Sequence, residues 1–347
     1  MLNRKFISRN YKHLDNGGGI AKSDIDITLE NLGYQNIGLR RSFYHNNLVH
    51  GIRNFIGLQK AMMSIHRNDA IVLQYPMKIG FDRICKKAHQ RGAKIICLIH
   101  DLSSFRNKSL TPDEEIMRLN ATDVLLTHNH MMRQWLSEHG CKVKMIDYEI
   151  MDYLHGESGE PHEPVAGNYS LFYVGNVSFK THPYLRKLAE IMPDRDIYIY
   201  GHHPDTEEIS KYNNLHYMGI VSDRQIIKSH MGDFGLSWYG ESLDDGVGRI
   251  GEYMSYNNPH KISLYLRCNA PVIVWSKAGR AEFIEKGHLG LTVNSLATLD
   301  EKLKKIDYKE YRHLTDNVRN INAKLKSGFY LDQALRQAID YLSVSST

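Results

Sequence analysis

The sequence predicts an α/β protein of two domains that face each other across an interdomain cleft. Short apolar runs alternate with amphipathic helical patterns, the alternation stops once, at residues 151–168, and it then starts again. Continuous apolar strands that alternate with helices are typical of a parallel sheet covered on both faces. A chain of 347 residues is also long enough to build two cores.

The first half of the chain, residues 1–150, is expected to form the N-terminal domain. The stretches FDRICKKAHQRG and NHMMRQWLSEHG have helical spacing and end in the glycine expected just after a helix. Apolar, β-branched runs lie on either side of them, as strands do in alternating α/β units. After a first short strand, the predicted strands are residues 70–76, 93–101, 123–128 and 143–148.

Residues 151–168, MDYLHGESGEPHEPVAGN, are rich in Gly, Pro, Glu and His and lack periodicity, so we interpret them as a linker. Residues 169–325 follow as a second α/β domain. The stretch GFYLDQALRQAIDYL has apolar residues at helical spacing and predicts a C-terminal helix within residues 326–347. The strands predicted for the second domain are residues 169–176, 196–201, 215–220, 233–240, 270–276 and 289–295.

Composition excludes several classes of protein. Hydrophobic residues make up 42% of the chain, but no apolar run reaches the roughly 18–20 residues of a membrane span. The first residues, MLNRKFISRN, lack the apolar core of a secretory signal peptide. Four cysteines are scattered without paired spacing, which indicates a reducing, cytoplasmic location.

Charge and histidine content bear on partners and metals. The net charge of +5 is spread along the chain and no nucleic-acid-binding motif is present, so nucleic acid is not an expected partner. Scattered Lys and Arg can add up on one face, which leaves peripheral attachment to the inner face of the cell membrane open. The histidine groupings His128/His130 and His202/His203 have no carboxylate at ligand spacing, so we expect no metal.

The segment NNPHKISLYLRCNAPVIVW gives the strongest functional signal. Pro259 suits the first position of a helix, with Asn258 as its N-cap, and Lys261 then lies in the first turn, where the helix dipole disfavours a cation. Because a strand follows this helix, the helix N-terminus lies at the carboxyl edge of the sheet. A phosphate bound there would offset Lys261, with His260 and Ser263 as neighbours. The alternative is an exposed lysine that costs a few tenths of a kcal/mol.

The segment CLIHDLSSFR places His100 and Asp101 at the carboxyl end of a buried strand. Reactive groups of α/β domains commonly lie there. Asp101 could deprotonate an acceptor hydroxyl, or His100 could do so with Asp101 orienting it. The alternative is that Asp101 or Ser103 only caps the next helix.

Two glycine-containing turns give weaker signals. In YVGNVSFK, Gly175 allows close approach of the backbone, and Lys180 could face an anion. In DNGGGIAKSD, the glycines precede a helix whose N–H groups could meet a ligand, so Gly18, Gly19 and Ser23 are candidate contacts. A tight turn that binds nothing explains this second segment equally well.

The segment GVGRIG, residues 246–251, matches the dinucleotide pattern G-x-G-x-x-G. ESLDD separates it from its strand, and only EYMSY follows before NNP. A dinucleotide fingerprint directly follows a strand and opens a long helix. We therefore reject this interpretation and expect either a glycine-rich loop that closes over a ligand or a plain surface loop.

The segments LIHDLSSFR, YVGNVSFK and GEYMSYNNPHKISLYLRCNAPVIVWSKAGRAEFI resemble bacterial β-1,6-galactofuranosyltransferases of O-antigen and capsule assembly. More distantly, the chain is similar to the glucosyltransferases that extend GlcNAc on streptococcal serine-rich adhesins. The resemblance spans nearly the whole chain, and Asn-Pro-His-Lys is its most specific part. It implies the GT-B fold, with two Rossmann-like domains, an acceptor domain at residues 1–150, a UDP-sugar domain at 169–325 and a last helix that crosses back.

The resemblance also implies roles for residues. Lys261 would hold the UDP diphosphate beside Asn258 and Ser263, and Gly175 and Asn176 would form the turn beneath the nucleotide. The glycine loop at residues 17–19 would close the cleft from the other domain. The adhesin-extending relatives carry an arginine after the second-domain glycine turn, where this sequence has VSFK. Phe179 or Lys180 stands near the position of that arginine, so the sequence does not identify the equivalent contact to the donor.

These observations predict an inverting glycosyltransferase that needs no metal or cofactor and transfers a hexose from a UDP-sugar. Galactofuranose is the first choice of hexose and glucose the second, and the acceptor is a saccharide, lipid-linked or glycoprotein molecule. Asp244, Asp245 and Glu252 are candidate contacts to sugar hydroxyls, or simply solvated loop acids. A non-catalytic nucleotide-sugar-binding subunit or glycosylation chaperone is the alternative of another class. The sequence is compatible with a homo-oligomer.

Overall fold

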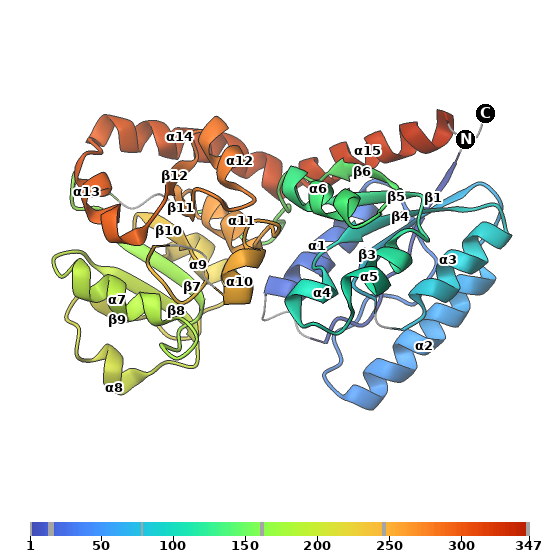
Figure 1. Cartoon of the computed structure of the whole chain (residues 1–347), viewed down its shortest axis with the longest axis horizontal. Coiled ribbons are helices and arrows are strands. Elements are labelled where there is room, and N and C mark those ends of the chain that lie inside the picture. The colour runs from blue at the N-terminus through green and yellow to red at the C-terminus, as the bar shows by residue number, and fades with distance from the viewer. Residues whose placement is uncertain (1, 13–16, 78, 160–162, 245–247, 345–347) are drawn as a thin grey trace. The chain divides into compact units, whose positions relative to one another are not determined.

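The structure, a computed structural model, consists of two compact units (Figure 1). Unit 1 comprises Met1–Asp152 and Ser327–Thr347, and unit 2 comprises Tyr153–Lys326. The chain therefore leaves unit 1 once and returns to it near the C-terminus. The residues that the structure describes are 2–12, 17–77, 79–159, 163–244 and 248–344.

Unit 1 is built on a parallel sheet with the strand order β2-β1-β3-β4-β5-β6. Its central strands β3 and β4 carry almost only buried side chains, as expected for a sheet covered on both faces. The strands are β1 (Asn3–Phe6), β2 (Gln35–Asn36), β3 (Asp69–Tyr75), β4 (Lys94–Ile99), β5 (Val124–Thr127) and β6 (Lys144–Asp147).

Three helices of unit 1 begin where the sequence supplies a side-chain cap. Asn46 and Asn129 accept backbone N–H groups of α2 and α6, and Thr111 forms a capping box with Glu114 at the start of α5. These helices are α1 (Gly17–Asn31), α2 (Asn47–Met63), α3 (Phe81–Gln90), α4 (Ser103–Arg106), α5 (Pro112–Leu119), α6 (His130–Glu138) and α15 (Phe329–Val344).

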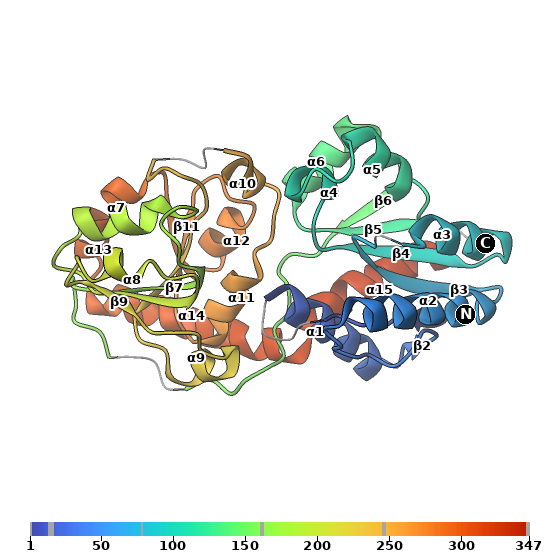
Figure 2. The same cartoon turned by 90° about the horizontal axis from the view of Figure 1, so that it is seen from below.

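Helix α15 returns to unit 1 and packs against β6 and α1 (Figure 2). The Asp152 carboxylate accepts hydrogen bonds from the backbone N–H groups of Tyr330 (3.2 Å) and Leu331 (2.8 Å). It also accepts one from the Tyr148 hydroxyl at 3.0 Å. Asp152 thus caps α15 from a distant part of the sequence and fastens the returning helix to the end of the first segment.

Unit 2 repeats the parallel architecture with the strand order β12-β11-β10-β7-β8-β9. Its strands are β7 (Leu171–Asn176), β8 (Ile197–His202), β9 (Leu215–Tyr217), β10 (Phe234–Ser237), β11 (Val272–Trp275) and β12 (Gly290–Val293). Its α-helices are α7 (Pro183–Ile191), α8 (Thr206–Ile209), α9 (Asp223–Ser229), α10 (Gly248–Tyr253), α11 (His260–Arg267), α12 (Ala281–Lys286), α13 (Leu299–Lys304) and α14 (Tyr308–Ser327).

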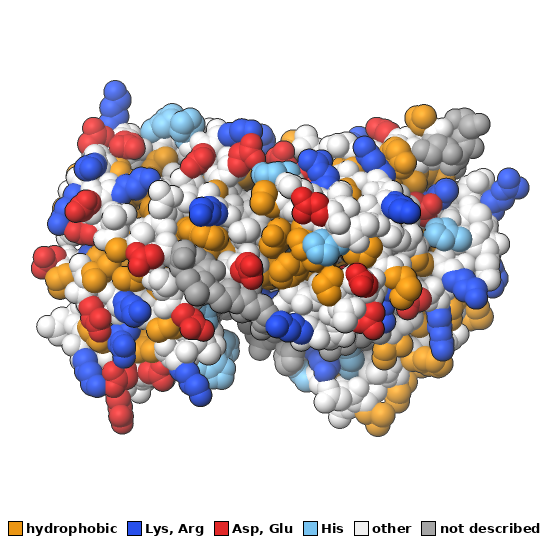
Figure 3. Space-filling model, in the orientation of Figure 1, with side chains coloured by type: hydrophobic (Ala, Val, Ile, Leu, Met, Phe, Trp, Pro, Cys, Tyr) orange, Lys and Arg blue, Asp and Glu red, His pale blue; other side chains and the backbone are white. Residues whose placement is uncertain are grey.

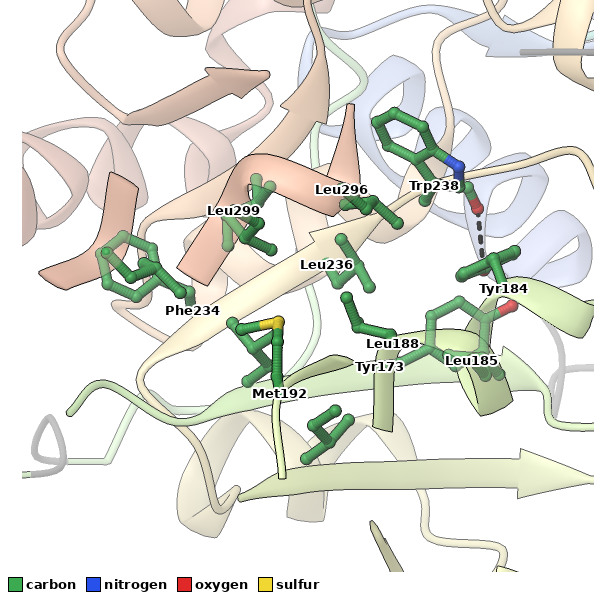
Figure 4. Close-up of a cluster of buried hydrophobic side chains, with 14 of the residues drawn as sticks. Tyr173, Tyr184, Leu185, Leu188, Met192, Phe234, Leu236, Trp238, Leu296 and Leu299 are labelled. Atoms are coloured by element: carbon green, nitrogen blue, oxygen red, sulfur yellow. Dashed lines mark hydrogen bonds between the residues drawn. The ribbon is translucent and has the colours of Figure 1, made fainter. Parts of the chain in front are cut away.

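The core of unit 2 fixes the carboxyl end of β10. Leu236 and Trp238 are buried among side chains of α7, β7 and the segment around Leu296 (Figure 4). The Tyr184 hydroxyl donates to the Trp238 carbonyl oxygen at 3.0 Å, and the indole N–H of Trp238 donates to the carbonyl oxygen of Ser242 at 3.0 Å. These contacts hold the chain just after β10, where Tyr239 enters the site described below.

The ten strands expected after the first short one are all present, with ends that shift by a few residues. Two local predictions are wrong. Pro259 has an extended backbone (ψ 122°) and occupies the N-cap position, so α11 begins at His260 and Asn258 is not its cap. The glycines at 17–19 form the first turn of α1 rather than a loop before it.

Candidate active site

Each sheet has one place where the strand order reverses. In unit 1 it lies between β1 and β3, and in unit 2 it lies between β7 and β10. Open α/β sheets bind ligands outside the carboxyl ends of the strands at this place. In unit 2, Lys261 lies at this place. In unit 1, His100 follows β4, one strand beyond the reversal, and contacts Gln74 of β3. Each unit is described separately.

In unit 2, the Lys261 amine lies between two tyrosine rings. Its Nζ is 4.2 Å from the ring centroid of Tyr173, which belongs to β7, and 4.6 Å from that of Tyr239, which follows β10. Both contacts are in the range of a cation–π interaction. Since the two rings come from the strands on either side of the reversal, the lysine charge is held at the switch point of this sheet.

Gly175 makes room for this amine. Its φ of +151° lies in a region that favours glycine, and a Cβ at this position would lie 3.0 Å from the Tyr173 hydroxyl and 3.5 Å from Lys261 Nζ. Any larger side chain would crowd both groups. The turn after β7 is further held by the Asn176 side chain, whose Oδ1 accepts the N–H of Ser178 at 3.0 Å.

Helix α11 is fixed on the sheet by Tyr265, one turn after Lys261. The Tyr265 hydroxyl donates to the carbonyl oxygen of Leu236 and accepts the N–H of Val174, both at 3.0 Å. A Cβ on Gly235 would lie 2.3 Å from the Tyr265 ring, so this close packing needs glycine. One tyrosine thus connects α11 to β7 and β10 and places Lys261 over their carboxyl ends.

The positive charge of Lys261 lowers the pKa of a neighbouring histidine, His182. Burial lowers the pKa of His182 from 6.5, and the positive charge of Lys261 lowers it further, to about 4. His182 is therefore neutral at pH 7 and does not compete with Lys261 for an anion. The site combines one cation, two aromatic faces and a glycine turn, which suits a negatively charged ligand such as a diphosphate.

The other residues predicted for this unit differ in burial and in contacts. The His260 ring stacks on Tyr153 with a centroid distance of 4.4 Å, and Ser263 is completely buried within α11. Asn258 is also buried, whereas Lys180 is exposed. Asn258, His260, Ser263 and Lys180 stay predictions as donor contacts.

The acids predicted to bind sugar hydroxyls are only partly described. Asp244 is exposed and its Oδ1 accepts a hydrogen bond from the Ser295 hydroxyl at 2.8 Å. Glu252 is exposed on α10. Asp245 and the first two residues of GVGRIG lie outside the described residues.

In unit 1, His100 follows β4 and its ring is fixed by a residue of β3. The Nε2 atom of His100 lies 2.7 Å from Oε1 of Gln74. The Gln74 Nε2 donates to the carbonyl oxygen of Lys22 (3.1 Å), to Oδ1 of Asp26 (2.8 Å) and to the Tyr11 hydroxyl (3.2 Å). Because three acceptors surround Nε2 of Gln74, the side-chain oxygen of Gln74 is the atom that faces His100.

This arrangement determines the histidine tautomer. Because Gln74 Oε1 can only accept, the Nε2 atom of His100 must carry a hydrogen and donate it. In the neutral ring the lone pair is then on Nδ1. His100 can therefore take up a proton only at Nδ1, which is the property required of a general base.

The polar groups behind His100 form a buried cluster with perturbed acidity. Burial raises the pKa of Asp26 to about 7, although hydrogen bonds from Ser8 and Tyr11 oppose that shift. Burial and the charge of Arg9 lower the pKa of Lys22, whereas Asp101 raises it. Asp101 is half-buried and lies close enough to Lys22 for its negative charge to raise the pKa of that lysine.

The glycine-rich segment of unit 1 contributes less than expected. Gly18 is exposed in the first turn of α1, while Gly19 and Ser23 are buried. The sequence analysis missed Gln74 and Asp26, although a lone polar residue in the apolar run AIVLQYP is a usable signal. It also missed Tyr173 and Tyr239, which only the strand order identifies.

Among the described residues, no group of three or more His, Cys, Asp or Glu side chains is arranged to hold a metal ion. Within the same residues, no helix combines the length and hydropathy needed to cross a bilayer.

Comparison with known sequences gives one consistent family. The model of the glucosyltransferase 3-like N-terminal domain matches residues 4–150, and that of the C-terminal domain matches residues 171–338. The chain is 28% identical to the β-1,6-galactofuranosyltransferase WbbI of Escherichia coli K12, over 96% of this chain and 97% of that protein. It is 27% identical to glucosyltransferase 3 of Streptococcus gordonii, over 92% of this chain and 93% of that protein.

Solved structures agree on the fold. The Anabaena protein HepE in complex with UDP matches with a TM-score of 0.63 and 13% identity, over 99% of this chain and 100% of that chain. The apo form of the lipopolysaccharide outer core galactosyltransferase WaaB matches with a TM-score of 0.58 and 12% identity, over 97% and 99%. The fold is thus GT-B, with two Rossmann-like units.

Proposed function

The chain belongs to the glucosyltransferase 3-like family and is a UDP-sugar-dependent hexosyltransferase, and from this premise we propose that its donor is UDP-galactofuranose. A relative named as a galactofuranosyltransferase, similar over nearly the whole chain, supports this choice. UDP-glucose is the second candidate, because two streptococcal relatives are named glucosyltransferase 3. The acceptor that we propose is a saccharide of a growing surface polysaccharide or glycan, either lipid-linked or on a glycoprotein.

The observation that carries the proposal is the position of Lys261 between Tyr173 and Tyr239 at the switch point of unit 2. A lysine there supplies a point charge for phosphate oxygens, and the N-terminus of α11 adds backbone N–H groups and the positive end of its dipole. We expect the diphosphate of the donor to bind at this place, with Gly175 and Asn176 beneath it. Two aromatic faces keep the amine in position before the ligand arrives.

The reaction that we propose is a direct displacement. His100 Nδ1 or the Asp101 carboxylate removes the proton of an acceptor hydroxyl, and the hydroxyl oxygen attacks the anomeric carbon. The bond from that carbon to the diphosphate oxygen breaks, and UDP leaves with the electron pair. Lys261 and the α11 dipole stabilise the negative charge that develops on the leaving diphosphate. A single displacement inverts the anomeric configuration.

We also propose that no metal is required and that the enzyme works in the cytoplasm. The lysine and the helix N-terminus supply the positive charge that a metal would otherwise bring to the diphosphate. The four cysteines are free and buried, which suits a reducing compartment. Full activity after treatment with EDTA is the expected result, and loss of activity that Mg²⁺ or Mn²⁺ restores would overturn the metal proposal.

Slow hydrolysis of the donor tests the function without knowledge of the acceptor. We expect UDP release from one of UDP-galactofuranose, UDP-galactopyranose and UDP-glucose, and loss of that release in Lys261→Ala. Lys309→Ala is the matched control, since Lys309 is an exposed lysine on α14 of the same unit and is not a predicted donor contact. No release with any donor would favour a non-catalytic nucleotide-sugar-binding subunit. Release unchanged in Lys261→Ala would overturn the assigned site.

The donor ranking has a separate test. Thermal unfolding with each of the three UDP-sugars and with UDP alone should show the largest stabilisation for UDP-galactofuranose. Equal shifts for all four would mean that only the nucleotide is recognised, and this would remove the basis for ranking the sugars.

A further inference from the structure

Helix α2 exposes an apolar face that is interrupted at Gln59. Leu48, Ile52, Phe55, Ile56 and Met63 are between 49% and 71% exposed, and their spacing places them on one side of the helix. Hydrophobic side chains gather over this helix in the space-filling view (Figure 3). Isolated exposed apolar residues are normal, but a row of them on one helix indicates a binding surface.

The opposite side of α2 is the one that packs on the core of unit 1. Gly57, Leu58 and Ala61 are the buried residues of the helix and pack against the rest of unit 1. Tyr44, before the helix, and Ile79, before the glycine that follows β3, are also exposed apolar residues of this part of unit 1. The exposed apolar residues are therefore not the ones that attach α2 to unit 1.

The segment that contains α2 is strongly basic. From Leu32 to Phe81 the sequence has six Lys or Arg residues and one acid, Asp69. Asp69 is completely buried and paired with Lys5 at 2.8 Å, so it contributes no negative charge to the surface. The basic residues are Arg40, Arg41, Arg53, Lys60, Arg67 and Lys78.

Two of these cations lie on the flank of the apolar face. Arg53 donates to the Ser42 hydroxyl at 3.0 Å, and Lys60 donates to the carbonyl oxygen of Gly38 at 2.9 Å. The guanidinium of Arg53 is also 5.2 Å from the ring centroid of Tyr44. These contacts are with neutral groups, so they orient the side chains without neutralising their charge.

We propose that α2 binds the surface of an anionic lipid bilayer, lying in its plane with Leu48, Ile52, Phe55, Ile56 and Met63 inserted among the acyl chains. A helix with an apolar face and flanking cations is the usual form of such an interfacial anchor. The cations then meet the lipid headgroups. This proposal is independent of the donor, acceptor and catalytic base proposed above.

The charge of this segment favours an anionic membrane, and not a second copy of the chain, as the partner of α2. Two copies that joined through α2 would bring two basic segments together with no exposed acid between residues 32 and 77 to offset them. Like charges placed opposite each other oppose association. An anionic membrane provides both an apolar interior and the opposite charge.

Co-sedimentation of the full chain with vesicles tests the proposal. The vesicles are pure phosphatidylcholine, or phosphatidylcholine with about 30% phosphatidylglycerol, at low and high salt. We expect binding to the anionic vesicles to be at least about tenfold tighter than to the neutral ones, and to weaken with salt. No binding to either vesicle, or equal binding to both, would overturn the proposal.

Substitutions locate the surface. The double variant Ile52→Glu/Phe55→Glu should lose at least about tenfold of the binding, because it places two charges in the acyl region. Met117→Glu is the matched control, since Met117 is 70% exposed on α5 of the same unit, and should bind as the unaltered protein does. An unchanged far-UV circular dichroism spectrum and an unchanged thermal unfolding midpoint of the double variant show that the fold is intact.

Two results would contradict the α2 surface in particular. The first is a loss of binding in Met117→Glu that reaches half of that in the double variant on a logarithmic scale, which would make the effect one of net charge alone, because Met117→Glu adds one charge and the double variant adds two. The second is a dimer of the unaltered protein that the double variant dissociates, without any vesicle binding by either protein. That result would assign the α2 face to a second copy of the chain.

Discussion

The two sheets of this protein have the same architecture but hold different chemistry at the carboxyl ends of their strands. At the carboxyl edge of unit 1, a histidine is fixed by a glutamine that belongs to a buried network of acids and hydroxyls. At the corresponding edge of unit 2, a lysine is held between two tyrosine rings. The first arrangement suits proton transfer and the second suits anion binding. A shared fold thus fixes where a site lies, and the side chains at the strand ends decide what it does.

The largest effects should separate these two roles. His100→Gln and Asp101→Asn are expected to affect turnover, and the variant that removes the base should lower kcat by about 10²–10⁴ with little change in UDP affinity. Lys261→Gln should weaken UDP binding as well as turnover. Turnover and isothermal titration with UDP provide the two measurements. If His100→Gln and Lys261→Gln lost UDP binding equally, the division between the units would fail.

Crowding the glycine turn should have the next largest effect. Gly175→Ala adds a Cβ 3.5 Å from Lys261 Nζ in a backbone region that favours glycine, so UDP affinity should fall by about tenfold or more. Gly219→Ala is the matched control, because Gly219 also has a positive φ (+83°) but nothing within 4 Å of a Cβ. Equal loss of UDP affinity in both variants would mean that backbone strain, and not contact with Lys261, is responsible.

Gln74 is expected to act as a positioning residue for His100. Gln74→Leu removes the acceptor of the Nε2 hydrogen, so the ring should populate both tautomers and kcat should fall by roughly tenfold. Gln74→Glu keeps an acceptor and should restore the Nε2–H tautomer. Nitrogen NMR of the labelled histidine reports the tautomer directly. A Gln74→Leu protein that retained a single Nε2–H tautomer would contradict this role.

Two buried carboxyls should make the stability of unit 1 depend on pH. Burial raises the pKa of Asp26 and of Asp152 from 3.8 to about 7, so the folded protein binds these protons more tightly than the unfolded chain. Stability from this source is complete below about pH 4 and is lost as the pH rises towards 7. Each carboxyl can lower the free energy of unfolding by up to about 1.4 kcal/mol per pH unit in that range.

Urea unfolding between pH 4.5 and 7.5 measures this slope, and Asp26→Asn should flatten it. Asp340→Asn is the control, because Asp340 is exposed on α15 of the same unit. A slope that stayed the same in Asp26→Asn would show that Asp26 ionises normally in the folded protein.

The smallest effect concerns His182. The charge of Lys261 contributes to its pKa of about 4, so a bound diphosphate should raise that pKa, by about one unit or less. Lys261→Gln should raise it in the absence of ligand. NMR titration of the His182 ring follows both changes. If the pKa of His182 did not change when UDP was added, the diphosphate would not bind beside Lys261.

Much of the fold could be predicted because the strands are unusually uniform. Runs such as AIVLQYP and APVIVW are apolar and β-branched, and each became a buried parallel strand. Strand β2 was missed because it has only two residues. The start of α11 was misplaced by one residue because Pro259 suits both the N-cap and the first helical position, and only its ψ of 122° decides between them.

The site was predictable only where it follows from the order of elements. Lys261 was found because a helix that precedes a parallel strand must begin at the carboxyl edge of the sheet. Its partners were not found, since Tyr173 and Tyr239 are about 66 residues apart in the sequence and meet only through the pairing of β7 with β10. His260 and Ser263 were inferred from proximity in sequence, whereas their helical positions direct one towards Tyr153 and bury the other.

The return of α15 to unit 1 has a consequence for biosynthesis. All segments of unit 2 are contiguous, from Tyr153 to Lys326, whereas unit 1 lacks α15 until the last part of the chain is made. During translation the second unit can therefore complete its core before the first one does, the reverse of the usual order. Until then, the surface of β6 and α1 that α15 covers stays open and the Asp152 carboxylate lacks the two N–H groups it will cap. The nascent chain would need the greatest protection from aggregation at this stage.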